Sequence, residues 1–350
     1  MPRRVVVAGA GGIAGDWLRP LSRRPDVELV AVADPDTARA SSLLAEQALD
    51  VPVDDDLGSA LARGADLLVN LTPPGLHRAV SEQGLAAGCD VLTEKPLTDA
   101  LPDAVSLVEA ARAAGRTLAV MQNRRYLAPV VRMNELVAEG AIGEVVHVCI
   151  DMFLWHVHGR DWLRRAESPL LRDMAIHPFD AVRAVTGLEP VEVQATEWTN
   201  PATWLEGAPA AACTWRLENG AVFSYRGSWA AEGLETSYDG VWRVGGTTGT
   251  VVWDGERTLT VETVARDGPL GAPTRHRREE VLPPPPDIGH AACLHEMLDA
   301  LAHRRQPATV ATDNLVSLAM VYASLRSARE RRTITLAETL TEAARAAQRS

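Results

Sequence analysis

A glycine-rich loop near the N-terminus constrains the fold more than any other feature of the chain. In the run "RVVVAGAGGIAGDW", Gly9, Gly11 and Ala14 follow an apolar stretch with the spacing G-x-G-x-x-A. The first glycine permits a tight turn, the second lets the backbone approach a pyrophosphate, and the small third residue allows close packing of helix against strand. The run therefore predicts a strand, a turn and a helix N-terminus that faces phosphate groups. The predicted phosphate-binding residues are Gly9, Gly11, Gly12, Ile13 and Ala14.

An acidic residue at the end of the next apolar run supports this interpretation. The run "VELVAVAD" ends at Asp34, and Ala14 lies twenty residues before it. An acid at about this spacing accepts hydrogen bonds from the ribose hydroxyls of a dinucleotide and repels a 2′-phosphate. The sequence therefore predicts NAD as the cofactor and favours it over NADP.

Residues 1–123 alternate short Val- and Leu-rich runs with longer helical patterns. This rhythm is typical of βαβ units, which build a parallel sheet covered on both faces. The candidate strands are "RVVVAG", "VELVAVAD", "DLLVNLT", "DVLTEK" and "TLAVMQ", and the candidate helices are "DTARASSLLAEQA", "GLHRAVSEQGLAAG" and "LPDAVSLVEAARAAG". An α/β Rossmann domain with a doubly wound parallel sheet is the prediction for residues 1–123.

The pattern changes in residues 124–350, for which we predict one α+β substrate-binding domain. The strand-like runs here are "EVVHVCIDMFLW", "PVEVQATEW", "AACTWRL", "AVFSYRGSW", "VWRVGG", "GTVVWDG" and "TLTVETV", and turn residues separate them. They predict a large, mainly antiparallel sheet with an open face. Such a face without covering helices usually seeks a partner, so we expect a homodimer or homotetramer through this sheet.

Composition excludes several classes of partner. A formal charge of −11 and a pI near 5.4 argue against a nucleic-acid-binding surface. The apolar runs are too short for a membrane helix, and the first one is too short for a signal peptide, so we expect a cytoplasmic protein without membrane contact. The four cysteines lack C-x-x-C spacing, "HVH" has no nearby third ligand, and His290 and His295 in "HAACLHE" are poorly spaced for one helix face, so we expect no metal.

The loops after the later strands carry the next candidates, since ligands collect at the carboxyl ends of parallel strands. Lys95 follows an apolar strand and precedes a proline; its charge would stabilise a developing alkoxide, although a lysine is more often a solvated surface amine. His77 has either a binding or a structural role, and Arg124 either binds substrate or forms an interdomain ion pair. The candidates that border this crevice are Thr72, Pro73, Pro74, His77, Glu94, Lys95, Asn123 and Arg124.

Several motifs in fixed order resemble one family over essentially the full chain. They are "AGAGGIA", "TPPGLH", "TEKPL", "NRRY", "DMAIHPFDAVRAVTG" and "RERRTITL", and they are similar to the glucose-fructose oxidoreductase, inositol dehydrogenase and rhizopine catabolism family, abbreviated Gfo/Idh/MocA. The resemblance implies a Rossmann domain followed by an α/β domain whose open sheet packs between subunits. It also implies oxidation or reduction of a hydroxyl carbon in a sugar, inositol or related polyol.

The resemblance assigns a catalytic set of Lys95, Asp173 and His177, with the Asp and the His on the first helix of the second domain. Imidazole titrates near neutral pH, which suits a base for the hydroxyl proton. Pro178 fits only near the first turn of a helix, so His177 should lie at a helix N-terminus. The alternative is that Asp173 and His177 only cap this helix. We expect Asp180 to pair with Arg124, Arg183 or the backbone.

A tryptophan- and histidine-rich run supplies further candidates for substrate contact. Trp155, His158 and Trp162 in "LWHVHGRDW" would line the face of a sugar, or would simply alternate along a half-exposed strand. The predicted substrate-binding residues are Lys95, Arg124, Trp155, His158, Trp162, Asp173 and His177. Many relatives carry glycines immediately before the Asp, whereas this chain has "AESPLLRD", so the pocket floor differs.

The leading hypothesis is an NAD(P)-dependent dehydrogenase that acts on a CH–OH group of a small polyol or sugar. Two alternatives remain open at this stage. One is a redox-neutral, NAD-dependent glycosidase of the same family, and the other is a catalytically silent NAD-binding regulator.

Overall fold

The computed structural model describes residues 2–155, 161–268, 272–284 and 289–349, with only the backbone of Asp161 and Trp162. The chain divides into two compact units. Unit 1 comprises Met1–Asn123, Asp287–Leu318 and Thr341–Ser350, and unit 2 comprises Arg124–Pro286 and Ala319–Leu340. The sequence predicted a single continuous second domain, whereas the structure assigns two later segments to unit 1.

A parallel six-stranded sheet forms the centre of unit 1. Its strands are β1 (Arg3–Ala8), β2 (Val27–Ala33), β3 (Val53–Asp54), β4 (Leu67–Asn70), β5 (Asp90–Thr93) and β6 (Leu118–Val120). They lie in the order β3-β2-β1-β4-β5-β6, which is the doubly wound order with a switch point between β1 and β4. The central strands are buried on both faces, as their continuous Val and Leu runs predict.

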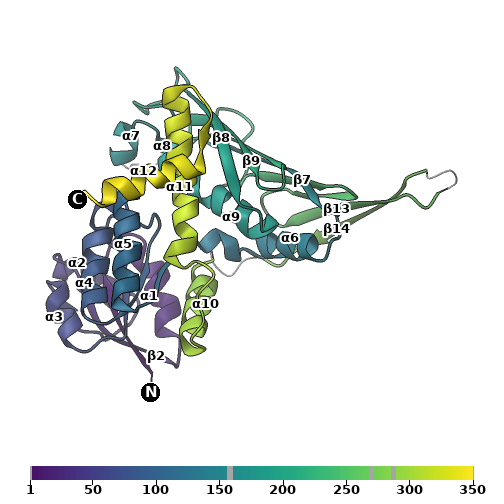
Figure 1. Ribbon diagram of the computed structural model, residues 1–350. Coiled ribbons are helices and arrows are strands. Elements are labelled where there is room, and N and C mark those ends of the chain that lie inside the picture. The colour runs from purple at the N-terminus through teal and green to yellow at the C-terminus, as the bar shows by residue number, and fades with distance from the viewer. Residues whose placement is uncertain (1, 156–160, 269–271, 285–288, 350) are drawn as a thin grey trace. The chain divides into compact units, whose positions relative to one another are not determined.

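The handedness of the strand connections decides which face of the sheet the helices of unit 1 cover. They are α1 (Ala14–Ser22), α2 (Thr37–Glu46), α3 (Leu57–Ala62), α4 (His77–Ala86), α5 (Leu101–Ala114) and α10 (His290–Ala302), with a short 3-10 turn η1 (Pro74–Leu76). The connections β1 to β2 and β4 to β5 cross the sheet in opposite directions. Because such crossovers are right-handed, α1 and α4 cover opposite faces. Helix α4 packs beside α5 (Figure 1), and α1 packs against α10.

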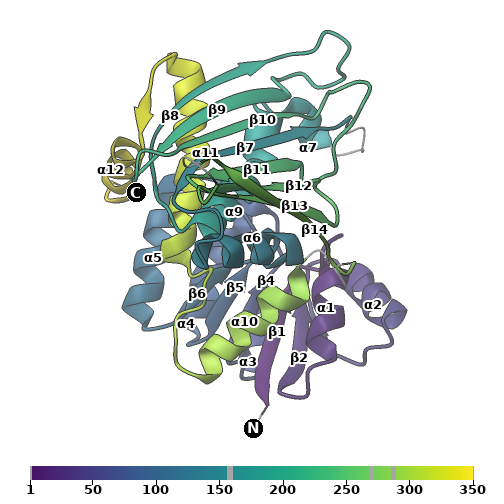
Figure 2. The same cartoon turned by 90° about the vertical axis from the view of Figure 1, so that its right-hand side faces the viewer.

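A nine-stranded, mainly antiparallel sheet forms the centre of unit 2. Its strands are β7 (Val145–Phe153), β8 (Pro190–Trp198), β9 (Ala210–Leu217), β10 (Val222–Ser228), β11 (Val241–Gly246), β12 (Gly249–Trp253), β13 (Thr258–Ala265), β14 (Thr274–Val281) and β15 (Ile334–Thr335). They lie in the order β14-β13-β12-β11-β7-β10-β9-β8-β15, and most of this order can be followed in Figure 2. Only β7 and β10 pair in parallel within this sheet.

One face of this sheet is covered by helices. These are α6 (Ala128–Ala138), α7 (Asp161–Arg165), α8 (Pro169–Asp173) and α9 (Ile176–Thr186), with η2 (Asn123–Tyr126) before α6. Helix α9 packs on β7, α8 packs on β9, and α6 packs on α9. Phe179 of α9 is fully buried, with its ring centre 5.6–6.1 Å from the rings of Trp215, Phe223 and Tyr225. This aromatic cluster fixes α9 on the sheet.

Each of the last two helices contains a boundary between the two units. They are α11 (Ala311–Glu330) and α12 (Leu336–Ala347). The division between Leu318 and Ala319 falls within α11, and the division between Leu340 and Thr341 falls within α12. In unit 2, the Ser327 hydroxyl accepts a hydrogen bond from the backbone N–H of Ala195 on β8.

The predicted fold class is confirmed, while three local features of the structure were not predicted. The charged run "TRHRREEV" forms the edge strand β14, whose side chains are mostly exposed and whose backbone pairs with β13. The run "PLLRDMAIHPFDAVRAVT" forms two helices that are separated after Asp173. The two-residue strand β3 has no apolar run to reveal it.

Candidate active site

The glycine loop in unit 1 has the geometry of a phosphate cradle. It connects β1 to α1, and α1 begins at Ala14. Gly9 has φ +98°, and a Cβ atom there would lie 2.9 Å from the backbone carbonyl of Leu71, so only glycine fits. A Cβ at Gly11 or Gly12 would meet no atom within 4 Å, so the loop opens into space on this side. No side chain caps the N-terminus of α1 at Ile13, which suits a bound phosphate.

Asp34 lies at the end of β2 and is joined to this loop. Its carboxylate accepts hydrogen bonds from the backbone N–H groups of Ala10 (2.7 Å) and Asp36 (2.8 Å) and from the Arg39 guanidinium (2.6 Å). Burial alone would raise the pKa of Asp34, but these hydrogen bonds outweigh it and the pKa is lowered. Asp34 is therefore an anion at the position where the ribose of a dinucleotide is held. The residues of this edge thus fit NAD.

The loop after β4 is held together from within. The amide oxygen of Asn70 accepts a hydrogen bond from the Thr72 hydroxyl at 2.6 Å. His77 is fully buried, and its ring nitrogens lie 2.7 Å from the carbonyl oxygens of Thr72 and Pro96. Burial lowers the pKa of His77, against the two carbonyl oxygens, which favour the protonated ring. Of the two roles considered for His77, this placement supports the structural one. Pro73 and Pro74 lie at the start of η1 in the same loop.

Glu94 and Lys95 follow β5 at the same carboxyl edge. Glu94 accepts a hydrogen bond from the Trp17 indole at 2.7 Å, so its carboxylate is bound within unit 1. Lys95 is half-buried. It is also the only lysine among the 35 Lys and Arg residues of the sequence. The chain uses arginine wherever else it needs a cation, yet a guanidinium cannot lose a proton and an amine can. The presence of a single lysine is therefore a further indication that Lys95 has a function, and the sequence motifs do not show it.

Asp173 and His177 lie on successive helices of unit 2. Asp173 is the last residue of α8, and His177 lies in the first turn of α9, as Pro178 predicted. The two do not lie on one helix as the resemblance implied, because α8 ends at Asp173 and α9 begins at Ile176. Their side chains are largely buried, with 9 % and 7 % exposure. His177 lines a narrow, partly open pocket in unit 2, with a cavity volume of about 10 Å³.

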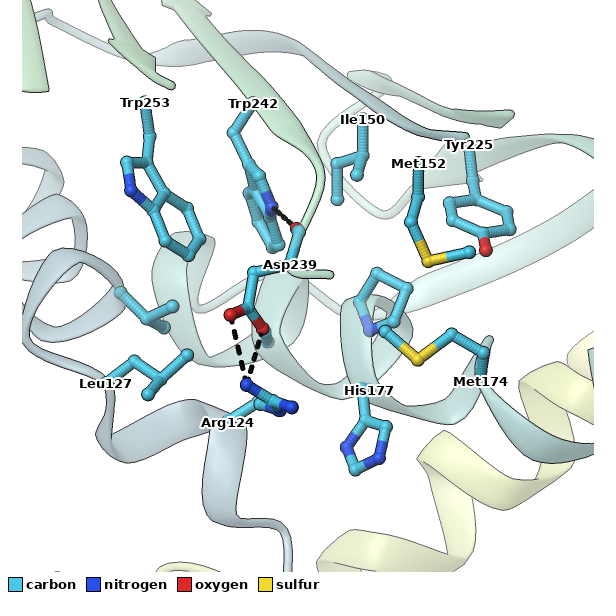
Figure 3. A pocket seen from close by; sticks show the side chains of 13 residues that line it. Arg124, Leu127, Ile150, Met152, Met174, His177, Tyr225, Asp239, Trp242 and Trp253 are labelled. Carbon is cyan, nitrogen blue, oxygen red and sulfur yellow. Dashed lines mark hydrogen bonds and ion pairs between the residues drawn. The ribbon is translucent and has the colours of Figure 1, made fainter. Parts of the chain in front are cut away.

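This pocket is mainly apolar, with one ion pair at its side (Figure 3). Arg124 pairs with Asp239 at 2.9 Å, and the Arg124 guanidinium lies 4.9 Å from the ring centre of Tyr238. Burial raises the pKa of Asp239, although Arg124 opposes the shift. The sequence analysis missed Asp239, which stands in a loop without any motif. The residues that line the pocket are Arg124, Leu127, Val130, Ile150, Met152, Met174, His177, Pro178, Ala181, Tyr225, Asp239, Trp242 and Trp253.

A second buried ion pair fixes α9 next to this pocket. Asp180 accepts two hydrogen bonds from Arg125, at 2.6 and 2.7 Å, and both side chains are almost fully buried. We expected Arg124, Arg183 or the backbone as the partner of Asp180. Arg183 pairs with Glu189 at 2.8 Å. The Asp180 pair and the Arg124 pair both lie within unit 2.

The structure gives less information on the remaining predicted site residues. Trp155 is half-buried and forms an isolated bridge with Ala230. His158 and the Trp162 side chain lie outside the described residues. Asn123 is buried and begins η2. Within the described part of the chain, no group of three potential metal ligands is found. The helices described here include none that is long and apolar enough to cross a membrane.

Sequence comparison assigns the class of protein. Residues 3–122 match the profile described as "Oxidoreductase family, NAD-binding Rossmann fold", and residues 130–252 match the "GFO/IDH/MocA C-terminal domain". The chain belongs to the Gfo/Idh/MocA family of oxidoreductases, so the predicted family is confirmed. Its N-terminal domain is of the NAD-binding type, as the glycine loop and Asp34 predicted.

Individual relatives agree with this assignment. The chain is 26% identical over 347 residues to inositol 2-dehydrogenase of Rhizobium meliloti, covering 96% of this chain and 100% of that protein. It is 26% identical over 329 residues to 1,5-anhydro-D-fructose reductase of Ensifer adhaerens, covering 91% and 94%. An oxidoreductase from Agrobacterium radiobacter, solved with NAD+, L-tartaric acid and magnesium, shares the fold with a TM-score of 0.86 at 23% identity, over 97% of this chain and 99% of that one.

Proposed function

We propose that the protein is an NAD-dependent dehydrogenase that oxidises a CH–OH group of a sugar, an inositol or a related polyol. One observation carries the proposal: the only lysine of the chain follows β5, at the carboxyl edge of the sheet whose β1 loop fits a dinucleotide. Polyol and sugar substrates in the names of the relatives support the substrate class.

The roles of the residues follow from the chemistry of a carbinol. NAD, when bound, supplies the hydride acceptor. As the hydroxyl proton leaves, negative charge develops on the substrate oxygen, and the Lys95 ammonium stabilises it. The His177 imidazole takes the proton, since its usual pKa lies near neutrality. Asp173 orients the substrate or the ring. The glycine loop and Asp34 hold the pyrophosphate and the ribose.

The substrate site in this proposal borders the narrow pocket beside His177. Its charged and imidazole side chains are Arg124, Asp239 and His177, and the other lining residues are aliphatic, proline or aromatic. Arg124 neutralises Asp239, so a neutral substrate meets no uncompensated charge there. Trp155 and the side chains of His158 and Trp162 remain candidates for contact with the sugar face.

A turnover assay tests the proposal. Purified protein is incubated with NAD or NADP and a panel of inositols, aldoses and anhydro sugars, and the reduced cofactor is followed by its absorbance. We expect activity with at least one polyol and a preference for NAD. Lys95→Met removes the positive charge and keeps a side chain of similar length, and we expect it to lower kcat about 100-fold. His303→Gln, at an exposed site directly after α10, serves as the control.

Two results would redirect the proposal. Cleavage of aryl glycosides without accumulation of reduced cofactor would identify the redox-neutral glycosidase. Tight NAD binding without any reaction across the panel would identify a regulator.

We further propose that the protein is a homo-oligomer and acts in the cytoplasm. The face of the nine-stranded sheet opposite the helices presents Trp198, Val222 and Val241, each 39–41 % exposed. Exposed apolar side chains on one open face favour association of two such sheets. All four cysteines are free thiols, which suits a reducing compartment.

A further inference from the structure

The loop Glu94–Pro96, which carries Lys95, is held at both of its ends by buried side chains of unit 1. At the N-terminal end, Glu94 continues β5, and its backbone N–H donates to the carbonyl of Asn70 at 2.9 Å. At the C-terminal end, the carbonyl of Pro96 lies 2.7 Å from Nδ1 of His77. Lys95 therefore lies between two anchored neighbours.

The anchor at Glu94 is a small buried cluster. One carboxylate oxygen, Oε1, accepts a hydrogen bond from the Trp17 indole at 2.7 Å and lies 3.4 Å from Nε2 of His290. The other oxygen, Oε2, accepts the backbone N–H of Lys95 itself at 2.9 Å. Burial alone would raise the pKa of Glu94, but His290, Trp17 and Lys95 together lower it. Glu94 is thus a buried anion that links His290 to the backbone of Lys95.

The position of His290 is fixed by close packing. It is 4 % exposed and is the first residue of α10, and its ring lies edge-on to Trp17 at 5.9 Å between centres. The preceding Gly289 has φ +92°, and a Cβ there would lie 2.2 Å from the carbonyl oxygen of Asn123. Only glycine allows this approach, so the start of α10 is set against the chain that follows β6.

We propose that His290 is a positioning residue, which acts through Glu94 to hold Lys95 in place, and that His77 holds the same loop from Pro96. The inference rests on the proposed function of Lys95, because positioning matters only if this amine acts on substrate. It assigns a role to a histidine 195 positions away in the sequence, in a segment that motif analysis gives no reason to associate with Lys95.

The charged groups around these two imidazoles are those of the same loop. His290 faces Glu94, and Glu94 is influenced in turn by Lys95. His77 is influenced by Glu94 and Lys95 and by the carbonyls of Thr72 and Pro96. A change in either histidine should therefore alter how the reactivity of Lys95 depends on pH.

The single lysine makes a direct test possible without any substrate. Reductive methylation with formaldehyde and cyanoborohydride modifies only two amines in this chain, Lys95 and the N-terminus. Peptide mass mapping gives the rate at Lys95, and the N-terminal amine is the internal reference. The ratio of the two rates is measured in the full-length protein across neutral and mildly alkaline pH, with and without NAD.

Two substitutions at His290 distinguish a role of its hydrogen bond to Glu94 from a role of its packing. His290→Phe keeps a buried ring but cannot donate to Glu94, and we expect it to change the rate ratio about tenfold, the size of one lost hydrogen bond to a charged group. His290→Gln keeps a donor and should restore the ratio to within about twofold. His303→Gln should leave it unchanged. In any polyol assay, His290→Phe should lower kcat and leave KM for NAD nearly unaffected.

A third substitution keeps the test decisive if His290→Phe fails to fold. Glu94→Gln preserves size and can still accept from Trp17, but it removes the anion, so it should reproduce the altered rate ratio. If Glu94→Gln and His290→Phe act on one link, the double variant should show no more than the larger single effect.

Two outcomes would overturn the inference. One is a wild-type rate ratio and pH profile in folded His290→Phe or in Glu94→Gln. The other is an equal change in His290→Phe and His290→Gln, which would indicate packing alone. Labelling needs no turnover, so absent polyol oxidation with altered labelling would reject the proposed function and leave the link between His290 and Lys95 intact.

Discussion

The buried pair of Arg125 and Asp180 gives a quantitative test of how α9 is anchored. The side chains are 11 % and 2 % exposed and are joined by two hydrogen bonds of 2.6 and 2.7 Å. Removing one member leaves the other charge buried without its counter-ion, which costs about 3–5 kcal/mol. We therefore expect Arg125→Met to lower the free energy of unfolding of unit 2 by about this amount.

The double variant gives the sharper prediction. Arg125→Met with Asp180→Leu replaces the pair by apolar groups of similar volume, and leucine suits the helix at position 180. Such replacements are often neutral or stabilising by about 1–4 kcal/mol relative to the pair. The double variant should therefore be more stable than Arg125→Met alone, with a strongly non-additive cycle.

Urea unfolding followed by tryptophan fluorescence is the appropriate assay. Eight of the nine tryptophans lie in unit 2, so the signal reports mainly on that unit. A loss of this size should lower the urea midpoint of Arg125→Met by about 1–2 M. Additive effects of the two substitutions would refute the argument, as would single losses below about 1 kcal/mol, which is the range for exposed pairs.

Three further predictions concern the cofactor loop, Asp34 and the open sheet face. Gly9→Ala should abolish NAD binding in calorimetry, because the methyl group would strike the Leu71 backbone and the positive φ would be strained. Ser41→Ala, at an exposed site on α2, is the control. The pKa of Asp34 is lowered in the folded protein, so its stabilisation is present above the usual value of 3.8 and is lost as the pH falls through the folded value. Asp34→Asn should therefore lower Tm at neutral pH, with a difference that fades below pH 3.8, and a constant difference would contradict this. Val222→Glu should shift the mass seen in light scattering toward the monomer, whereas an unchanged mass would exclude this face from the interface.

The parts of the fold that sequence could predict are those with a local pattern. The glycine loop, Asp34 and the Val-rich strands each carry their own signal, so the doubly wound sheet followed from them. Strand β14 could not be recognised, because its charged side chains hide a backbone that pairs with β13. The break between α8 and α9 was also missed, since nothing polar or glycine-rich marks Met174 and Ala175.

The residues of the candidate site could likewise be predicted only where they stand in a local sequence motif. Lys95 and His177 stand in motifs, and Pro178 placed His177 at a helix start. Asp239 and His290 stand in none, and they gain their neighbours only through long-range packing against Arg124 and Glu94. The pairing of Asp180 with Arg125 was not predicted from the sequence, because it depends on how the chain around Arg125 packs against α9.

Unit 1 includes residues 287–318 as well as 1–123, so the nucleotide-binding unit cannot be isolated as the N-terminal segment alone. A fragment that stops at Asn123 contains every strand of the parallel sheet but lacks α10, whose first residue packs on Trp17. The indole would then meet water, and Glu94 would lose a neighbour. Such a fragment should precipitate or bind hydrophobic dyes, and grafting this half onto another protein would require residues 289–318 to be supplied as well.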